Sequence, residues 1–203
     1  DLVKQAEQVA STGLKEIVIT GINTGDFGRT TGEKFIDLLK ALDRVEGIDR
    51  YRISSIEPNL ITDEIIEFCA SSPKFVPHFH IPLQSGCDSV LARMRRRYTT
   101  ARYANRIEAV RKLMPDAFIG IDVIVGFPGE TDELFMETYN FLRDVVRPAF
   151  IHIFPYSRRA GTPAAVRKDQ VQDCVKTKRV QMLEDLCVKL HQEFIEANKG
   201  VSE

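Results

Sequence analysis

Residues 119–133 read IGIDVIVGFPGETDE, an apolar run that stops at a Gly-Phe-Pro-Gly turn. The β-branched residues of 118–125 predict a buried strand, because such side chains favour strands and parallel strands are usually covered on both faces. Asp122 interrupts this strand, and a carboxylate among apolar residues is costly unless it is paired or hydrogen-bonded. We expect Glu130 to begin the next helix, where its charge meets the positive end of the helix dipole. Asp122 is therefore the first candidate for a binding residue.

The same succession of strand, turn and helix recurs along the whole chain. We expect strands at 16–20, 50–54, 76–81, 118–125 and 150–154, and helices at 1–12, 33–45, 62–71, 87–95, 100–113, 130–145 and 168–198. Alternating strands and helices predict a parallel sheet with right-handed crossovers. Polar and glycine-rich turns follow every strand, and a barrel would gather them at one mouth. We therefore predict an α/β fold, a partial (β/α)6 TIM-like barrel of parallel strands whose first strand is missing. An open doubly wound sheet is the alternative.

Composition excludes several classes of protein. The chain has 203 residues, 43% of them apolar, and 28 basic against 29 acidic residues. A uniformly basic nucleic-acid binder is excluded, so any contact with phosphates must use a local patch. We find no apolar run that could cross a bilayer and no signal peptide, and we expect a soluble, cytoplasmic protein. The first residue is Asp1 rather than Met, so we expect a fragment of a longer protein. The four cysteines are scattered without CxxC or CxxxC spacing, which favours free thiols.

Three of the turns carry residues suited to ligand binding. TGINTG (20–25) has glycines that allow backbone N–H groups to approach a ligand, although an ordinary turn has the same composition. Glu57 stands at the end of a strand in SSIEP, where its carboxylate could hold an ammonium group or face water. HFHIPLQSG (78–86) ends on Gln84, an amide suited to hydroxyl groups. Its two histidines point to one face of the strand, and we expect core or rim residues rather than metal ligands there.

Two further stretches combine charge with aromatic residues. RMRRRYTTARYANRIEAVRK (93–112) holds eight basic residues and one acidic residue. It predicts either a solvated helix face or a clamp for phosphate or carboxylate, with Tyr98 and Tyr103 available to stack on bases. HIFPYSRRAGTPAA (152–165) places aromatic residues after the fifth strand, where they could sandwich a flat ring. The sequence has no Ser-His-Asp order, no Walker A motif and no GxGxxG fingerprint.

Taken together, six runs resemble the radical S-adenosylmethionine (SAM) methylthiotransferases, in order over about 15–166: TGINTGDFG, RISSIEP, HFHIPLQSG, MRRRYTT, DVIVGFPGETDE and FPYSRRAGTPAA. The chain looks most like the branch that modifies N6-threonylcarbamoyladenosine beside the tRNA anticodon. The isopentenyladenosine branch is the close runner-up. The ribosomal-protein branch fits less well, because His80 stands where that branch usually has an acid. Two rivals outside this family are a non-catalytic RNA-binding module and a sugar-phosphate barrel enzyme.

The resemblance implies a set of cofactors and partners. Such enzymes hold a 4Fe–4S cluster through a CxxxCxxC loop, and they use SAM and an electron donor to insert a methylthio group at C2 of the adenine. Their substrate is the tRNA anticodon stem-loop, and no membrane is involved. This sequence contains no CxxxCxxC, so we expect no metal ligand in it. It would be a partial barrel core (1–166) followed by a helix (167–203) that leads toward a missing RNA-binding domain, and it should be inactive alone.

The resemblance also assigns the SAM contacts. Thr20 and Gly21 would meet the methionine ammonium, and Ser55 and Glu57 would lie beside the methionyl part. Gln84 and Asp122 would address the ribose. Arg96 would pair with the methionyl carboxylate, although a shift of one residue would give this role to Arg95 or Arg97. The adenine would lie against these residues: Ile124 and the backbone from Phe154 to Tyr156. No residue is expected to act as a general base, because the cofactor carries the chemical step.

Overall fold

The computed structural model describes residues 1–200. The chain forms two compact units. The first unit comprises Asp1–Ile81 and Arg106–Phe118, and the second comprises Pro82–Asn105 and the chain from Ile119 onward.

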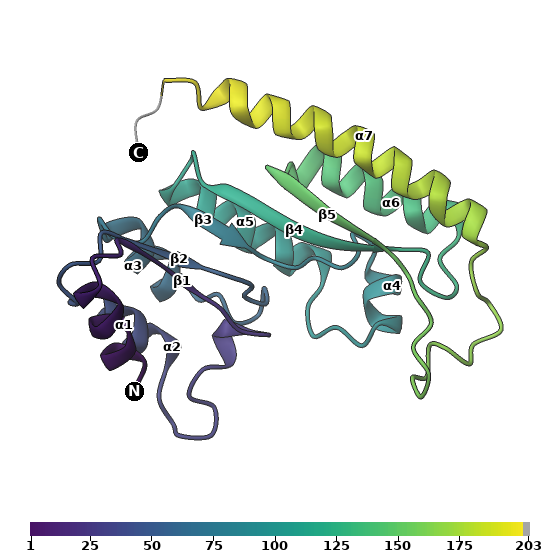
Figure 1. Cartoon of the computed structure of the whole chain (residues 1–203). Coiled ribbons are helices and arrows are strands. Elements are labelled where there is room, and N and C mark those ends of the chain that lie inside the picture. The colour runs from purple at the N-terminus through teal and green to yellow at the C-terminus, as the bar shows by residue number, and fades with distance from the viewer. Residues whose placement is uncertain (201–203) are drawn as a thin grey trace. The chain divides into compact units, whose positions relative to one another are not determined.

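The first unit contains a pair of parallel strands and three helices (Figure 1). Its elements in order are α1 (Leu2–Ser11), β1 (Glu16–Ile19), a 3-10 turn (Thr24–Asp26), α2 (Phe35–Asp43), β2 (Arg50–Ile53), α3 (Asp63–Ser71) and β3 (His78–His80). Strands β1 and β2 pair in parallel, with Glu16 opposite Arg50 and Ile19 opposite Ile53. Helix α2 buries an apolar stripe at helical spacing, which fixes the face that it turns to the core.

The second unit is built on two longer parallel strands. Its elements are α4 (Asp88–Arg93), β4 (Phe118–Val125, whose first residue belongs to the first unit), α6 (Asp132–Phe141), a π-helical turn (Leu142–Val146), β5 (Phe150–Pro155) and α7 (Asp173–Ala197). Helix α5 (Thr100–Leu113) has residues in both units. Strands β4 and β5 pair in register from Gly120 opposite Phe150 to Val125 opposite Pro155. Helix α7 packs along β5, as Figure 1 shows.

The two faces of β4 differ in burial. Ile119, Ile121, Val123 and Val125 are at most 1% exposed, whereas Asp122 and Ile124 are half-buried. This alternation has the period of a strand, so the odd-numbered side chains enter the core and the even-numbered ones line the other face. The prediction of a strand buried among apolar residues is therefore wrong for one face. Asp122 lies on the open face rather than inside the core.

The expected strands and helices are present, and the fold is α/β with parallel strands as predicted. Three helix starts lie two or more residues later than expected. Helix α2 begins at Phe35 rather than at 33. Helix α6 begins at Asp132 and not at Glu130, because Thr131 is the N-cap and its Oγ1 accepts the Leu134 amide at 3.4 Å. Helix α7 begins at Asp173 rather than near 168. Among residues 1–200, no helix is long and apolar enough to cross a membrane.

Candidate functional site

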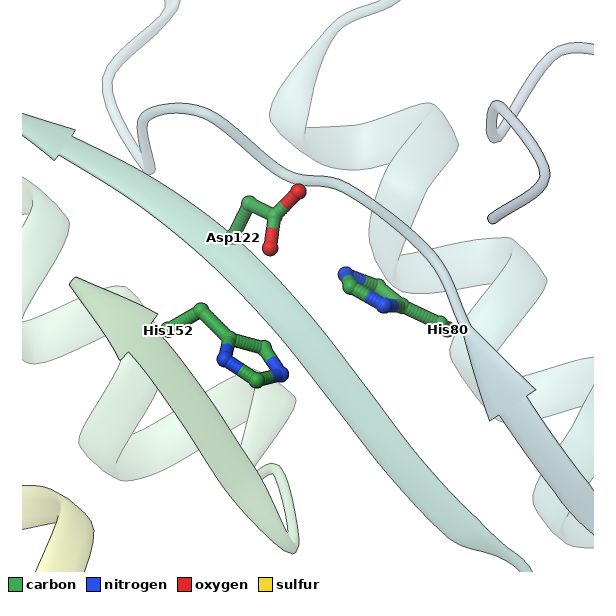
Figure 2. Close-up of side chains that lie close together, drawn as sticks. All are labelled: His80, Asp122 and His152. Atoms are coloured by element: carbon green, nitrogen blue, oxygen red, sulfur yellow. The ribbon is translucent and has the colours of Figure 1, made fainter. Parts of the chain in front are cut away.

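The open face of β4 and β5 brings together three of the predicted SAM contacts and one histidine. Asp122 lies opposite His152 in the register, and a carboxylate oxygen and an imidazole nitrogen of this pair lie within 4.8 Å of each other (Figure 2). One step further along the strands, Ile124 lies opposite Phe154, which is 49% exposed. The face therefore has an apolar part beside a polar part. Figure 2 also labels His80, which belongs to β3 of the first unit.

Two backbone hydrogen bonds pair Gln84 with the middle of β4. Its amide donates to the Asp122 carbonyl at 2.7 Å, and its carbonyl accepts the Ile124 amide at 2.9 Å. Its φ of 69° lies in the left-handed region, which residues with a β-carbon rarely adopt. Such strain persists only where neighbouring structure enforces it, and it is frequent at ligand sites. The structure thus places Gln84 between the two predicted contacts of β4.

Arg96 differs in burial from its two arginine neighbours. It is half-buried, whereas Arg95 and Arg97 are exposed. Tyr98 follows it and donates its hydroxyl to the carbonyls of Pro82 and Leu83 at 3.2 and 3.1 Å, which ties this segment to the residues just before Gln84. Of the three arginines, Arg96 is the one whose position fits a partly enclosed ligand group.

The sequence suggested that Tyr98 and Tyr103 could stack on bases. The structure does not support this role, because both rings are buried. Tyr98 is 6% exposed and Tyr103 is fully buried, with their ring centroids 6.4 Å apart. Tyr103 also packs edge-on against Phe141. Tyr103 is buried because it lies on the apolar face of α5 with Ile107 and Val110, whereas Tyr98 precedes this helix and is held by its bonds to Pro82 and Leu83.

Tyr156 continues β5 beyond its last paired residue. Its amide donates to the Val125 carbonyl at 2.8 Å, and its ring packs edge-on against Phe127 with the centroids 5.3 Å apart. The Lys176 ammonium lies 5.8 Å from the ring centroid and donates to the Tyr156 carbonyl at 3.1 Å. A cavity of about 810 Å³ opens here between 155–158 and the first turns of α7. The ring is thus engaged by the protein, which leaves the backbone as the part of Tyr156 that faces the strand ends.

The turn after β4 is held by a buried ion pair that the sequence did not reveal. Glu130 accepts the Gly126 amide at 2.7 Å and the Arg179 guanidinium at 2.8 Å. The side chains of Glu130 and Arg179 are 1% and 5% exposed. Burial, the largest cause, raises the pKa of Glu130, against the opposing effects of the Gly126 amide and of Arg179. Arg179 lies on α7, far from the turn in sequence, so no local motif could have indicated it.

In the first unit, the two turns with predicted contacts lie side by side. Thr20 and Gly21 follow β1 and are exposed. Thr24, further along the same turn, donates its amide and its hydroxyl to the Ser55 carbonyl at 3.1 and 2.9 Å. Asn23 accepts the Glu57 amide at 3.3 Å. Thr24 is buried, and its two hydrogen bonds join the turn after β1 to the turn after β2. This role was not predicted from the sequence.

The cysteines do not fit a 4Fe–4S cluster, which needs three thiolates that meet. Cys69, Cys87 and Cys187 are buried and Cys174 is exposed, and all four are free thiols as predicted. Burial raises the pKa of Cys69 to about 12, so this thiol stays protonated. Among residues 1–200, no group of three cysteines lies within ligand distance.

Parallel strands with polar and glycine-rich turns at their carboxyl ends define an α/β protein of the barrel class. Residues 1–142 match the Radical SAM superfamily, and the chain belongs to this superfamily. Members of this family use SAM and a 4Fe–4S cluster. The turns at 20–25, 54–58, 84–86 and 126–130 lie within the matched residues.

Two curated relatives are similar over most of the chain. Threonylcarbamoyladenosine tRNA methylthiotransferase MtaB of Bacillus subtilis (strain 168) is 50% identical over 96% of this chain and 43% of its own length. The tRNA-2-methylthio-N(6)-dimethylallyladenosine synthase of Parafrankia sp. (strain EAN1pec) is 43% identical over 92% of this chain and 38% of its own length. The chain spans less than half the length of these relatives.

Solved structures show the same fold at low sequence identity. Coproporphyrinogen III oxidase (HemN) from Escherichia coli, a radical SAM enzyme, matches 93% of this chain and 46% of its own with a TM-score of 0.66 and 15% identity. The radical SAM methyltransferase TsrM from Kitasatospora setae matches 81% of this chain and 32% of its own with a TM-score of 0.65 and 15% identity. The fold is the partial α/β barrel of radical SAM enzymes, as expected.

Proposed function

We propose that this chain is the SAM-binding core of a tRNA methylthiotransferase that inserts a methylthio group at C2 of N6-threonylcarbamoyladenosine beside the anticodon. The observation that carries the proposal is the 50% identity, over 96% of the chain, to a relative named for this activity. The dimethylallyladenosine relative, at 43% identity, supports N6-isopentenyladenosine in tRNA as the second candidate substrate. SAM, the tRNA anticodon stem-loop and an electron donor are the proposed partners.

The proposed roles follow the chemistry of each side chain. Asp122 and Gln84 hydrogen-bond ribose hydroxyls, since a carboxylate accepts and an amide both donates and accepts. Ile124 and the backbone from Phe154 to Tyr156 flank the adenine. Arg96 holds the methionyl carboxylate through bidentate hydrogen bonds. In the first unit, the proposed contacts to the methionyl part are Thr20, Gly21, Ser55 and Glu57.

The chain's own task is to bind and orient rather than to move protons. SAM supplies the radical chemistry when it is bound to a reduced cluster. The β4–β5 face must hold the adenosine in one orientation and keep water away from it. Because the four cysteines do not fit a cluster, we propose that this chain alone binds SAM but does not cleave it.

The test is a complementation experiment. The full gene that encodes this chain is expressed in a Bacillus subtilis strain without MtaB, and tRNA nucleosides are analysed by mass spectrometry. We expect 2-methylthio-N6-threonylcarbamoyladenosine to reappear. If the methylthio group appears only on isopentenyladenosine, the second candidate holds. If no methylthio nucleoside appears while the protein is produced, the proposal fails.

A further inference from the structure

The end of α4 carries an arginine where glycine is the usual residue. Arg95 has φ of 58°, and its amide bonds to the Ala92 carbonyl while the Arg96 amide bonds to the Leu91 carbonyl, both at 3.0 Å. These two bonds form a Schellman motif with Arg95 at the left-handed C′ position. Glycine adopts this conformation without the steric cost that a β-carbon brings. Arg95 thus occupies a position whose backbone conformation favours glycine.

Three arginines near this motif have no acidic partner among residues 1–200. Arg95, Arg97 and Arg102 are exposed, and none of them forms an ion pair within residues 1–200. Asp88 is the acidic residue of α4, and its carboxylate is engaged because it accepts the Thr100 amide at 2.7 Å. The charge of these arginines is therefore turned to solvent without compensation.

Hydrogen bonds through Gly129 link Arg93 of α4 to the loop 157–172, which also contains arginines. Arg93 donates to the Gly129 carbonyl, and the Gly129 amide donates to the Asp169 carbonyl at 2.8 Å. A β-carbon at Gly129 would lie 2.6 Å from both Arg93 Nη1 and Asp169 Oδ2, and its φ of 81° is one that residues with a β-carbon rarely adopt, so glycine is favoured here. Arg167 in turn donates to both carboxylate oxygens of Asp169, at 2.9 and 2.5 Å. The loop 157–172 is thereby held against the end of α4.

The same loop presents two more exposed arginines. Arg158 donates through Nε to Gln170 Oε1 at 3.1 Å, and this bond leaves the two terminal nitrogens of the guanidinium without a partner within residues 1–200. The Arg159 side chain forms no ion pair among these residues. We define the arginine surface as five residues that form no ion pair within residues 1–200: Arg95, Arg97, Arg102, Arg158 and Arg159.

We propose that the arginine surface binds the phosphate backbone of the RNA substrate. This inference rests on the proposed function, which supplies the RNA. The chain as a whole is near neutral, with a formal charge of −1, so five exposed guanidinium groups of one unit without an acidic partner among residues 1–200 give this unit an excess of uncompensated positive charge. Guanidinium groups match phosphate oxygens bidentately, and such contacts position a nucleic acid without reading its sequence.

The experiment measures binding of this 203-residue chain to a hairpin RNA with the sequence of a tRNA anticodon stem-loop, over a series of salt concentrations. For the variants Arg95→Gln/Arg97→Gln and Arg158→Gln/Arg159→Gln we expect about tenfold weaker binding each and a salt slope smaller by about 1–2. Arg95→Lys/Arg97→Lys should keep most of the slope, since it keeps the charge. The matched control is Lys189→Gln/Lys199→Gln, which removes two charges beyond the middle of α7 and should change little.

A second variant separates binding from a structural role. Arg95→Gly relieves the left-handed strain, so its melting temperature should rise by about 1–4 °C while RNA binding weakens. If Arg95 instead stabilises the C-terminal end of α4 through its positive charge, Arg95→Gly should lower the melting temperature.

Three results overturn the inference. These are a salt slope unchanged in both glutamine pairs, an equal loss in the control pair, and no binding of the hairpin by the wild-type chain. A preference for an acidic polypeptide over the hairpin at equal salt would assign the surface to a protein partner instead. None of these results bears on the modified nucleoside found in the complementation experiment, so the two proposals fail separately.

Discussion

Arg179 Nη1 lies 2.8 Å from Glu130 Oε2 in a buried ion pair that joins α7 to the turn after β4. The same carboxylate oxygen accepts the Gly126 amide, which directly follows the last residue of β4. The guanidinium also reaches Asp132 at the start of α6, through Nη2 at 2.7 Å. One side chain of α7 thus fixes both ends of the Gly-Phe-Pro-Gly turn. The orientation of the strand end that carries the proposed adenine contacts depends on this link.

Removal of the guanidinium leaves a buried carboxylate without its counterion. We expect Arg179→Met to lower the free energy of unfolding by about 3–5 kcal/mol at neutral pH, measured by urea denaturation. Asp132→Asn is the matched control, since this carboxylate is 84% exposed and its loss should cost less than 1 kcal/mol. The double variant Glu130→Gln/Arg179→Met should recover part of the loss, because it removes the uncompensated charge. An Arg179→Met protein as stable as the wild type would show that the pair contributes nothing.

The same variant has a predictable pH dependence. Burial already raises the pKa of Glu130, and loss of the cation raises it further. A carboxyl group whose pKa is higher in the folded state stabilises the fold below its unfolded pKa and loses this contribution as pH rises through the folded pKa. We therefore expect the stability deficit of Arg179→Met to be smaller at pH 5 than at pH 8, by urea midpoints. A deficit that grows toward acid pH would contradict the assignment.

The order of elements could be predicted from the sequence because the apolar runs and their periods are local signals. Glu130 shows where this reasoning fails. Its position beside a helix start is a local property, but its partner on α7 is distant in sequence. Asp122 was placed in the core because β4 is apolar along its length, and the exposure of one face depends on what covers it. Gln84 likewise has a left-handed backbone where it pairs with β4, and no local sequence motif indicates this pairing.

The proposed ribose contacts are tested by ligand affinity. We expect Asp122→Asn and Gln84→Ala to weaken binding of S-adenosylhomocysteine to this chain by about 10- to 100-fold, since each loses a hydrogen bond to the ligand. Calorimetric titration measures the change, and circular dichroism checks that the fold is kept. The control Glu133→Gln changes an exposed carboxylate of α6 and should bind as the wild type does. Unchanged affinity in both variants would remove these residues from the SAM site.

We expect His78 to make the stability of the first unit sensitive to acid pH. Its ring stacks on Phe118 with the centroids 4.7 Å apart. Burial, aided by the nearby Arg52, lowers the pKa of His78 to about 4. Because the folded state disfavours the protonated ring, stability is complete above the ordinary pKa near 6.5 and falls as pH drops from there toward 4, by about 1–2 kcal/mol. His78→Gln should flatten this fall in urea midpoints, whereas the control His191→Gln should keep it.

Thiol reactivity tests the placement of the cysteines. In the native protein at pH 8, iodoacetamide should modify Cys174 first, because it is the exposed thiol of the four. With its pKa near 12, Cys69 has about one thiolate in ten thousand molecules, and burial blocks access as well. Mass spectrometry of the peptides should show one label before urea and four after it, and the Cys174→Ser variant should stay unlabelled while folded. The same scattered thiols should yield no cluster absorbance when iron and sulfide are added anaerobically. A stable cluster on this chain would mean that its cysteines move together, which the packed positions of Cys69 and Cys187 oppose.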